Sequence, residues 1–397
     1  MNVATISADA RLKQVLWVLV PAISVVVATE FIVIGLLPLI ANDLGISLAE
    51  AGRLTGLFAL SAAVAGPGLT LLGSRWSPRS VLVFTLLLYS VGNTVMASSS
   101  NFSVLLTTRI IQGAMLPAFV SVGAAAVASL AMPDQRGRAL ANANLGFVIG
   151  VLVALPAGAA LAKWGNWRLP FVLLSLFSLV AAAVTWGRYP NYRVPEIPSI
   201  ALPLNLLRNA LFLGHLLLSV LLFASMFAAY TFLAAWLDGY LNLSGSQIAL
   251  TLLLFSAIGL MGNSVAARVA DRAPVVATVA SAAALVVAVN LAGAFHNVLP
   301  VIAVLLVIWS VAHTAGVTLS QVRVTMAGGQ APAFAMTMNL SCANLGIAIG
   351  AFCGGWAIDR GGVAAIGWVP AIFGALATIL CIVLARAGLV RNHRCIE

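Results

Sequence analysis

One acidic side chain lies deep inside a long apolar stretch of this sequence. Glu30 stands in the middle of the apolar run 15–41, whereas the other nine acidic residues fall in loops, tails or the ends of such runs. A carboxyl group at the centre of a bilayer costs about 2.5–3.5 kcal/mol on insertion scales, so it is usually retained for function. Burial disfavours its charged form, and a nearby arginine favours that form. Glu30 is therefore the first candidate for binding and releasing a proton.

A second candidate group lies in the apolar run 103–131. Arg109 is the only basic residue that we place inside a span, and Gln112 follows it one helical turn later. Because an arginine stays charged, it needs a partner there, and we expect Arg109 and Gln112 to face a central cavity and to communicate with Glu30. Each residue also has a structural alternative. Instead of exchanging a proton, Glu30 can stay ionised against Arg109 or lie near the outer surface. Instead of serving transport, Arg109 can simply pack helices together by binding backbone carbonyl groups.

The composition places these groups in a membrane protein. Hydrophobic residues make up 62% of the 397 positions and charged residues only 8%, against about 25% charged residues in soluble domains. Roughly 20 apolar residues suffice for a helix to cross the hydrocarbon core. Runs of about that length occur twelve times, at 15–41, 52–74, 80–98, 103–131, 140–162, 169–187, 211–236, 247–270, 274–295, 298–322, 333–357 and 362–387. We therefore expect the chain to lie in a lipid bilayer.

The twelve runs divide six and six around a proline-rich connection. That connection holds Pro190, Pro195, Pro198 and Pro203, and it predicts a six-helix N-terminal half at 1–187, a cytoplasmic linker at 188–210 and a six-helix C-terminal half at 211–397. Glycines spaced by four recur in the fifth and eleventh runs, and short basic turns follow the second and eighth. The sequence thus predicts an all-α membrane protein with twelve transmembrane helices in two pseudo-symmetric halves.

The basic residues indicate an orientation in the membrane. The net charge is +10, but the basic residues occur singly or in pairs between apolar runs, so we expect no nucleic-acid partner. With the N-terminus inside, fifteen of them fall on the cytoplasmic side and four on the outer side. Cytoplasmic loops carry the excess of Lys and Arg. Both termini are therefore expected in the cytoplasm.

Five features of the sequence match motifs of a known family. They are Thr29-Glu30-Phe31 with Gly35-Leu36-Leu37-Pro38, Arg109-x2-Gln112-Gly113, Gly146-x3-Gly150-x5-Pro156-x-Gly158, Trp167-Arg168-x2-Phe171, and the paired turns that hold Arg75, Arg79 and Asp271-Arg272. Together they resemble the major facilitator superfamily, and within it the twelve-span drug:proton antiporter group with its sugar and nucleoside exporter relatives. The chain departs from that pattern at Leu72, where an acidic residue is usual, and at Leu155, where a glycine is usual.

The resemblance implies a secondary active transporter of the bacterial inner membrane that works by alternating access. It implies proton-coupled efflux of a small drug-like molecule, with Glu30, Arg109 and Gln112 in proton coupling. The proton is then the coupling ion, and we expect no other cofactor, no metal and no enzymatic activity. Substrate, protons and membrane lipid are the expected partners of a monomer. The alternatives are a sugar or nucleoside exporter, a facilitator or proton symporter, and a sensor or assembly subunit that does not transport.

The same resemblance assigns residues to conformational switching. We expect a flexible seam between the halves at Gly146, Gly150, Pro156 and Gly158, with plain tight packing as the alternative. A cytoplasmic latch is expected at Asp271 and Arg272, with Arg75 and Arg79 in the equivalent first turn. Ordinary topology signals are the alternative interpretation of these charged turns.

Polar and aromatic residues inside the runs are candidates for substrate binding. They are Phe227, Tyr230, Trp236, Asn263, Gln321, Asn339, Asn344, Asn142 and Asn144. An apolar pocket with a few directional polar groups suits a small, partly apolar molecule that is uncharged or cationic. Each polar residue can instead join helices to one another. His215 and His313 are expected to be packing residues, with His313 as the alternative proton site.

Overall fold

The described part of the chain folds almost entirely as α-helices. The computed structural model describes residues 3–73, 75–132, 135–162, 166–190, 204–270, 273–295, 297–329 and 331–394. Its helices are α1 (Val3–Leu44), α2 (Leu48–Gly73), α3 (Pro78–Ser98), α4 (Phe102–Leu130), α5 (Arg136–Ala162), α6 (Leu169–Arg188), α7 (Leu204–Leu207), α8 (Ala210–Tyr230), α9 (Leu233–Gly239), α10 (Gly245–Ala270), α11 (Pro274–Ala294), α12 (Leu299–Ala327), α13 (Pro332–Gly361), a short 3₁₀ helix (Val363–Gly367) and α14 (Trp368–Arg394).

Twelve segments of the described chain are long and apolar enough to cross a membrane, and each overlaps one of the twelve predicted runs. The prediction of an all-α, twelve-span protein is therefore confirmed. The seventh span is predicted as one unbroken helix over 211–236, but the structure shows two helices there. Helix α8 ends at Tyr230, and α9 begins at Leu233 after a break at Thr231 and Phe232.

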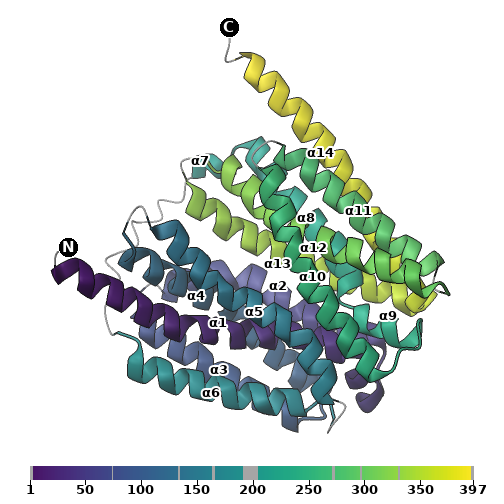
Figure 1. Cartoon of the computed structure of the whole chain (residues 1–397), viewed down its shortest axis with the longest axis horizontal. Helices are drawn as coiled ribbons and strands as arrows, with labels where there is room; N and C mark the ends of the chain where they lie inside the picture. Colours follow the sequence, from purple (N-terminus) through teal and green to yellow (C-terminus); the bar gives the residue numbers. More distant parts are fainter. Residues whose placement is uncertain are drawn as a thin grey trace.

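The helices form two groups with the same internal pairing, and Figure 1 shows α1–α6 on one side of the molecule and α8–α14 on the other. In the first group α1 packs on α5, α2 on α4, and α3 on α6. In the second group α8 packs on α13, α10 on α12, and α11 on α14. These are corresponding spans, so the halves are pseudo-symmetric. The domain boundaries stay a prediction, because residues 191–203 of the linker lie outside the described residues.

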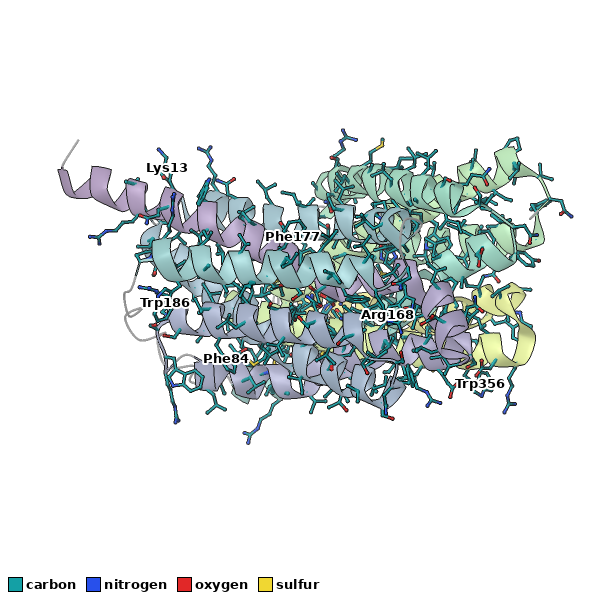
Figure 2. The ribbon with its side chains drawn as sticks, turned by 90° about the horizontal axis from the view of Figure 1, so that it is seen from below. Lys13, Phe84, Arg168, Phe177, Trp186 and Trp356 are labelled. Carbon is teal, nitrogen blue, oxygen red and sulfur yellow. The ribbon has the colours of Figure 1, made fainter. Side chains whose placement is uncertain are left out.

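Large apolar side chains cover the sides of the bundle. Phe84, Phe177, Trp186 and Trp356 are each more than half exposed, and Figure 2 shows them on the outside of the helices. A soluble monomer rarely exposes apolar patches larger than a few hundred Å², whereas lipid tails solvate such surface without penalty. The exterior therefore fits the hydrocarbon core of a bilayer.

Glycines set the close contact between the most tightly packed helices of each half. A methyl group added at Gly146 would lie 2.5 Å from the carbonyl oxygen of Val20, and one added at Gly350 would lie 2.6 Å from that of Ala224. The first pair joins α5 to α1, and the second joins α13 to α8. Gly150 likewise faces the Ser24 carbonyl. The predicted seam of Gly146 and Gly150 therefore lies inside the N-terminal half and not between the halves.

The two halves pack against each other through the helix pairs α2–α13 and α5–α10, and near the α1–α2 turn the contact is made by small and aromatic side chains. Gly52 and Gly56 at the start of α2 leave room for the rings of Phe232 and Phe352, and Gly355 packs against Ala49. This contact is thus made by apolar packing.

Candidate functional site

Glu30 lies within the core of the N-terminal half. Its side chain belongs to α1 and is 6% exposed, and no described residue donates a hydrogen bond to its carboxylate. The Arg109 cation on α4 attracts that carboxylate. Buried polar groups are normally hydrogen-bonded, so a buried carboxyl group without such a partner among the described residues is unusual.

Arg109 is held by three backbone carbonyl groups. It is fully buried, and it donates to the carbonyl oxygens of Thr29 at 2.9 Å, Glu30 at 3.0 Å and Leu54 at 3.2 Å. Its guanidinium also lies 4.2 Å from the ring centre of Phe58, at cation–π distance. The arginine therefore joins α4 to α1 and α2, and it binds the backbone of Glu30 rather than forming an ion pair with its side chain.

Gln112 extends this contact into a polar network with α3. Its amide donates to Asn93 at 3.3 Å, and Asn93 donates to the Thr29 hydroxyl at 3.1 Å. The Tyr89 hydroxyl donates to the backbone carbonyl oxygen of Gln112 at 2.9 Å. The sequence analysis missed Tyr89 and Asn93, because both lie in a stretch of the run 80–98 that matches no motif.

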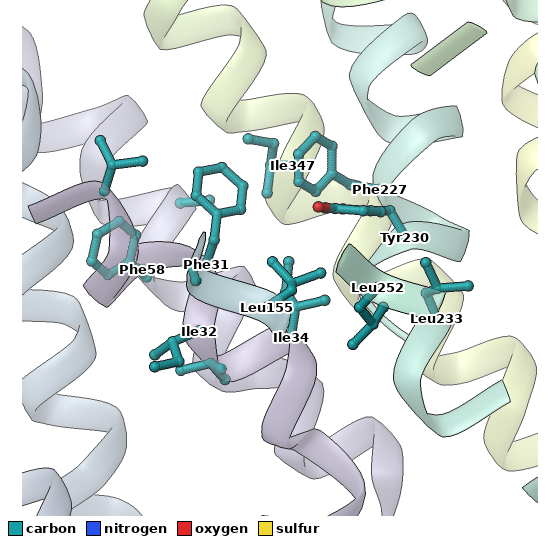
Figure 3. Close-up of a cluster of buried hydrophobic side chains, with 14 of the residues drawn as sticks. Phe31, Ile32, Ile34, Phe58, Leu155, Phe227, Tyr230, Leu233, Leu252 and Ile347 are labelled. Atoms are coloured by element: carbon teal, nitrogen blue, oxygen red, sulfur yellow. The ribbon is translucent and has the colours of Figure 1, made fainter. Parts of the chain in front are cut away.

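Aromatic side chains from both halves meet at the boundary between them. In the C-terminal half, His313 of α12 lies 5.4 Å from Phe227, 4.5 Å from Tyr230 and 6.5 Å from Phe255, as ring-centre distances. Phe31 of α1 lies 6.2 Å from Phe227. We call these five residues the aromatic cluster, and Figure 3 shows Phe31, Phe227 and Tyr230 close together. The structure thus brings two predicted substrate residues next to the residue that follows Glu30.

The other predicted substrate residues are dispersed. Trp236 is buried in α9 against Tyr240, and Asn344 is buried in α13 with its amide on its own helix. Asn263 is half-buried and accepts a hydrogen bond from Thr318. Gln321, Asn142 and Asn144 are exposed. Among the described residues, no three His, Cys, Asp or Glu side chains lie together as metal ligands would.

A second buried arginine corrects our placement of the basic residues. Arg323 is 1% exposed and lies inside the span Leu299–Ala327, not in a cytoplasmic loop. It donates to the His215 carbonyl at 2.7 Å, contacts His215 Nδ1 at 2.9 Å and donates to the Ser219 hydroxyl at 2.9 Å. Ser320 bonds both Ser219 and the predicted substrate residue Asn339. Arg323 therefore joins α12 to α8, and Ser320 joins the same network to Asn339 of α13.

Replacing Arg323 by methionine is expected to destabilise the C-terminal half. The methionine fills most of the volume but leaves Nδ1 of the His215 ring without its partner, and a buried polar group left unpaired costs about 1–3 kcal/mol. Thermal unfolding in detergent should show a lower Tm for Arg323→Met than for Arg268→Met, which removes an exposed arginine from the end of α10. Equal melting of the two variants would contradict this role.

Comparison with known proteins places this geometry in a family. The family model of the Major Facilitator Superfamily matches residues 19–325 and 216–394. The chain belongs to this superfamily. It is 32% identical over 263 residues to a chloramphenicol resistance protein of Streptomyces lividans, a match that covers 65% of this chain and 67% of the relative. It is 28% identical over 361 residues to the inner membrane transport protein YdhP of Escherichia coli (strain K12), covering 90% and 92%.

A solved structure has the same fold. A bacterial homologue of the human lysosomal transporter Spinster, crystallised in an inward-facing and occupied conformation, superimposes with a TM-score of 0.77. That match covers 95% of this chain and 97% of the other, with 17% sequence identity. This Major Facilitator Superfamily member is therefore a multi-pass membrane transporter for a small molecule.

The remaining motif residues of this superfamily member lie at the ends of its helices and along α5. Arg79 stacks over Trp186 at 4.5 Å, and Arg75 is exposed. Pro156 is buried within α5, and Gly158 packs against Ile32 of α1. Asp271 and Arg272 lie outside the described residues. The switching role of all these residues stays a prediction.

The sixth-span motif has a defined partner. Arg168 forms an ion pair with Asp43 at 2.7 Å, and the Trp167 indole donates to the same carboxylate at 3.0 Å. The contact joins the end of α1 to the start of α6, so these motif residues hold α1, which carries Glu30, against its neighbour.

Proposed function

We propose that this transporter exports a small drug-like molecule in exchange for protons. The observation that carries the proposal is the Glu30 carboxyl group, which is buried in a span and has no hydrogen-bond partner among the described residues. Such an intramembrane carboxyl group is expensive to keep and typical of proton relays. The relative named as a chloramphenicol resistance protein supports a drug-like substrate.

The arrangement around Glu30 suits a proton carrier. Arg109 holds the backbone of Glu30 in place through its carbonyl oxygen, so the carboxyl group stays next to a permanent positive charge. That charge stabilises the ionised carboxylate, and burial in apolar surroundings stabilises the protonated form. A movement of the halves that changes access to water shifts the balance between the two forms, so that one side of the membrane loads the proton and the other side releases it.

The available driving force is sufficient for export. One charge that crosses a potential of about 150 mV is worth roughly 3.5 kcal/mol, and every 1.4 kcal/mol corresponds to about a tenfold gradient. One proton per substrate therefore supports a gradient of a few hundred-fold. The proposal includes a monomer in the bacterial inner membrane with both termini in the cytoplasm, in keeping with the distribution of its basic residues.

Replacing Glu30 by glutamine is the direct test. Inverted membrane vesicles are energised to hold a proton gradient, and chloramphenicol is added while the gradient is followed with a fluorescent dye. Vesicles with the natural protein should lose part of the gradient on addition. Glu30→Gln should respond like vesicles without the transporter, because the glutamine amide keeps the shape of the side chain but cannot carry a proton.

Glu50→Gln is the matched control for that experiment. Glu50 is a half-exposed residue of the first turn of α2, where it accepts a hydrogen bond from the Ser47 backbone N–H, and a glutamine can make the same bond. This variant should transport like the natural protein. A response to substrate that survives in Glu30→Gln would remove Glu30 from the proton pathway.

A further inference from the structure

The imidazole of His313 is an unexplained polar group in the aromatic cluster. His313 is 8% exposed, and its Nδ1 is buried without a hydrogen-bond partner among the described residues. The rings of Phe227, Tyr230 and Phe255 surround it. Because an unpaired buried polar atom is rare and destabilising, its retention here points to a partner that comes from outside the chain.

Tyr230 supplies a second polar group at the same place. Its side chain is 3% exposed, and the structure records no hydrogen bond from its hydroxyl to a described residue. Tyr230 is the last residue of α8 before the break at Thr231 and Phe232. Figure 3 shows its hydroxyl oxygen directed towards the side on which Phe31 lies. Interrupted spans commonly carry the binding sites of transporters, so the position of this hydroxyl fits a contact to substrate.

The aromatic cluster also lies across the boundary between the two halves, which must separate there for a substrate to enter or leave. Phe31 of the N-terminal half meets Phe227 of the C-terminal half through ring packing alone, at 6.2 Å between ring centres. Phe31 packs against Phe147 of α5 on its other side. A planar ring inserted at this boundary can replace one aromatic contact with two, because aromatic rings pack well face to face with an offset or edge to face.

We propose that the aromatic cluster binds a neutral aromatic solute that carries hydroxyl or amide groups. The ring of the solute packs between Phe31 and Phe227, and its polar groups bond the Tyr230 hydroxyl and the His313 imidazole. The assignment deepens the proposed export function and rests on it for the substrate's direction of movement, but binding itself needs no proton coupling.

The charge and the number of polar groups select this chemical class. No acidic side chain belongs to the cluster, and the proposed export function assigns the Glu30 carboxyl group to the proton, so a cationic solute would lack a counter-charge in a buried site. A sugar carries more hydroxyl groups than two side chains can pair, and its unpaired hydroxyls would be costly to bury. A ring with two or three polar groups matches what the cluster offers.

Equilibrium binding to the purified protein in nanodiscs tests the inference. Three radiolabelled probes are used. Chloramphenicol is a neutral nitrobenzene derivative with hydroxyl and amide groups, and it is compared with glucose and with the aromatic cation tetraphenylphosphonium. We expect chloramphenicol to bind and the other two to bind at least about tenfold more weakly. Tyr230→Phe and His313→Phe, which keep the rings and remove the polar atoms, should each weaken chloramphenicol binding about tenfold.

Two further variants separate this inference from the export function. Tyr240→Phe removes a tyrosine hydroxyl that donates to the Gly293 carbonyl outside the cluster and should bind normally. Glu50→Gln should also bind normally, and binding is measured without a proton gradient, so a failure of proton coupling leaves the binding result intact. Unchanged chloramphenicol binding in both Tyr230→Phe and His313→Phe would overturn the inference. So would preferred binding of glucose or of the cation, or no chloramphenicol binding by the natural protein.

Discussion

Arg109→Leu should lose at least about 100-fold in substrate-driven proton movement while still inserting into the membrane. The leucine removes three charge-assisted hydrogen bonds and the cation–π contact with Phe58, and each such bond contributes about 1.5–3 kcal/mol. A loss of about 3 kcal/mol already changes an equilibrium by roughly 100-fold. The helices should still form, because these three carbonyl groups lie within α1 and α2 and also take part in helical hydrogen bonding.

The measurement is the gradient response in inverted vesicles, normalised to the amount of inserted protein. Arg53→Leu is the control, since it removes an exposed arginine from α2. Arg109→Lys adds a sharper comparison, because lysine keeps the charge but lacks the planar fork that reaches three carbonyl groups. We expect it to remain strongly impaired. Full activity of either Arg109 variant would reduce this residue to a packing role.

Gly113→Ala should prevent the N-terminal half from packing, with a loss of several kcal/mol in stability. Gly113 of α4 faces the Phe58 carbonyl and the Ser61 hydroxyl of α2, and an added methyl group would overlap both. Overpacking a rigid site costs about 1–3 kcal/mol, and more where backbone must move. The yield of monodisperse protein and its Tm in detergent should both fall sharply.

Gly68→Ala provides the matched comparison for that substitution. Gly68 also lies within a helix, α2, but an added methyl group there would have no neighbour within 4 Å. Alanine in a helix is favoured over glycine by roughly 0.5–1 kcal/mol, so this variant should be as stable as the natural protein or slightly more so. Equal behaviour of the two variants would mean that α2 and α4 are not packed as described.

The fold was predictable because a bilayer imposes one requirement on every span. Each crossing needs about 20 apolar residues in a helix, so the length of the apolar runs gave all twelve. The break in the seventh span was not predictable in the same way. Residues 229–233 contain no proline or glycine, and the interruption at Thr231 depends on where Phe232 packs against Gly52 and Gly355 of other helices.

The candidate site was predictable only where charge made a residue stand out. Glu30 and Arg109 were identified because a charged group inside a span is expensive. Arg323 was missed because it lies near the end of its run, where sequence cannot separate a buried residue from a loop residue. The contact between Tyr230 and His313 was also not predictable from the sequence, because the two residues are 83 positions apart in the chain and aromatic residues are common in any span.

The apolar contact between the halves near the α1–α2 turn has a thermodynamic consequence. If that end opens to water during transport, Gly52, Gly56 and Phe232 leave an apolar contact and become exposed to water. Exposure of apolar surface to water raises the heat capacity. The free-energy difference between the closed and open states is then curved in temperature, and the closed state gains stability on warming from the cold because hydrophobic contacts strengthen over that range.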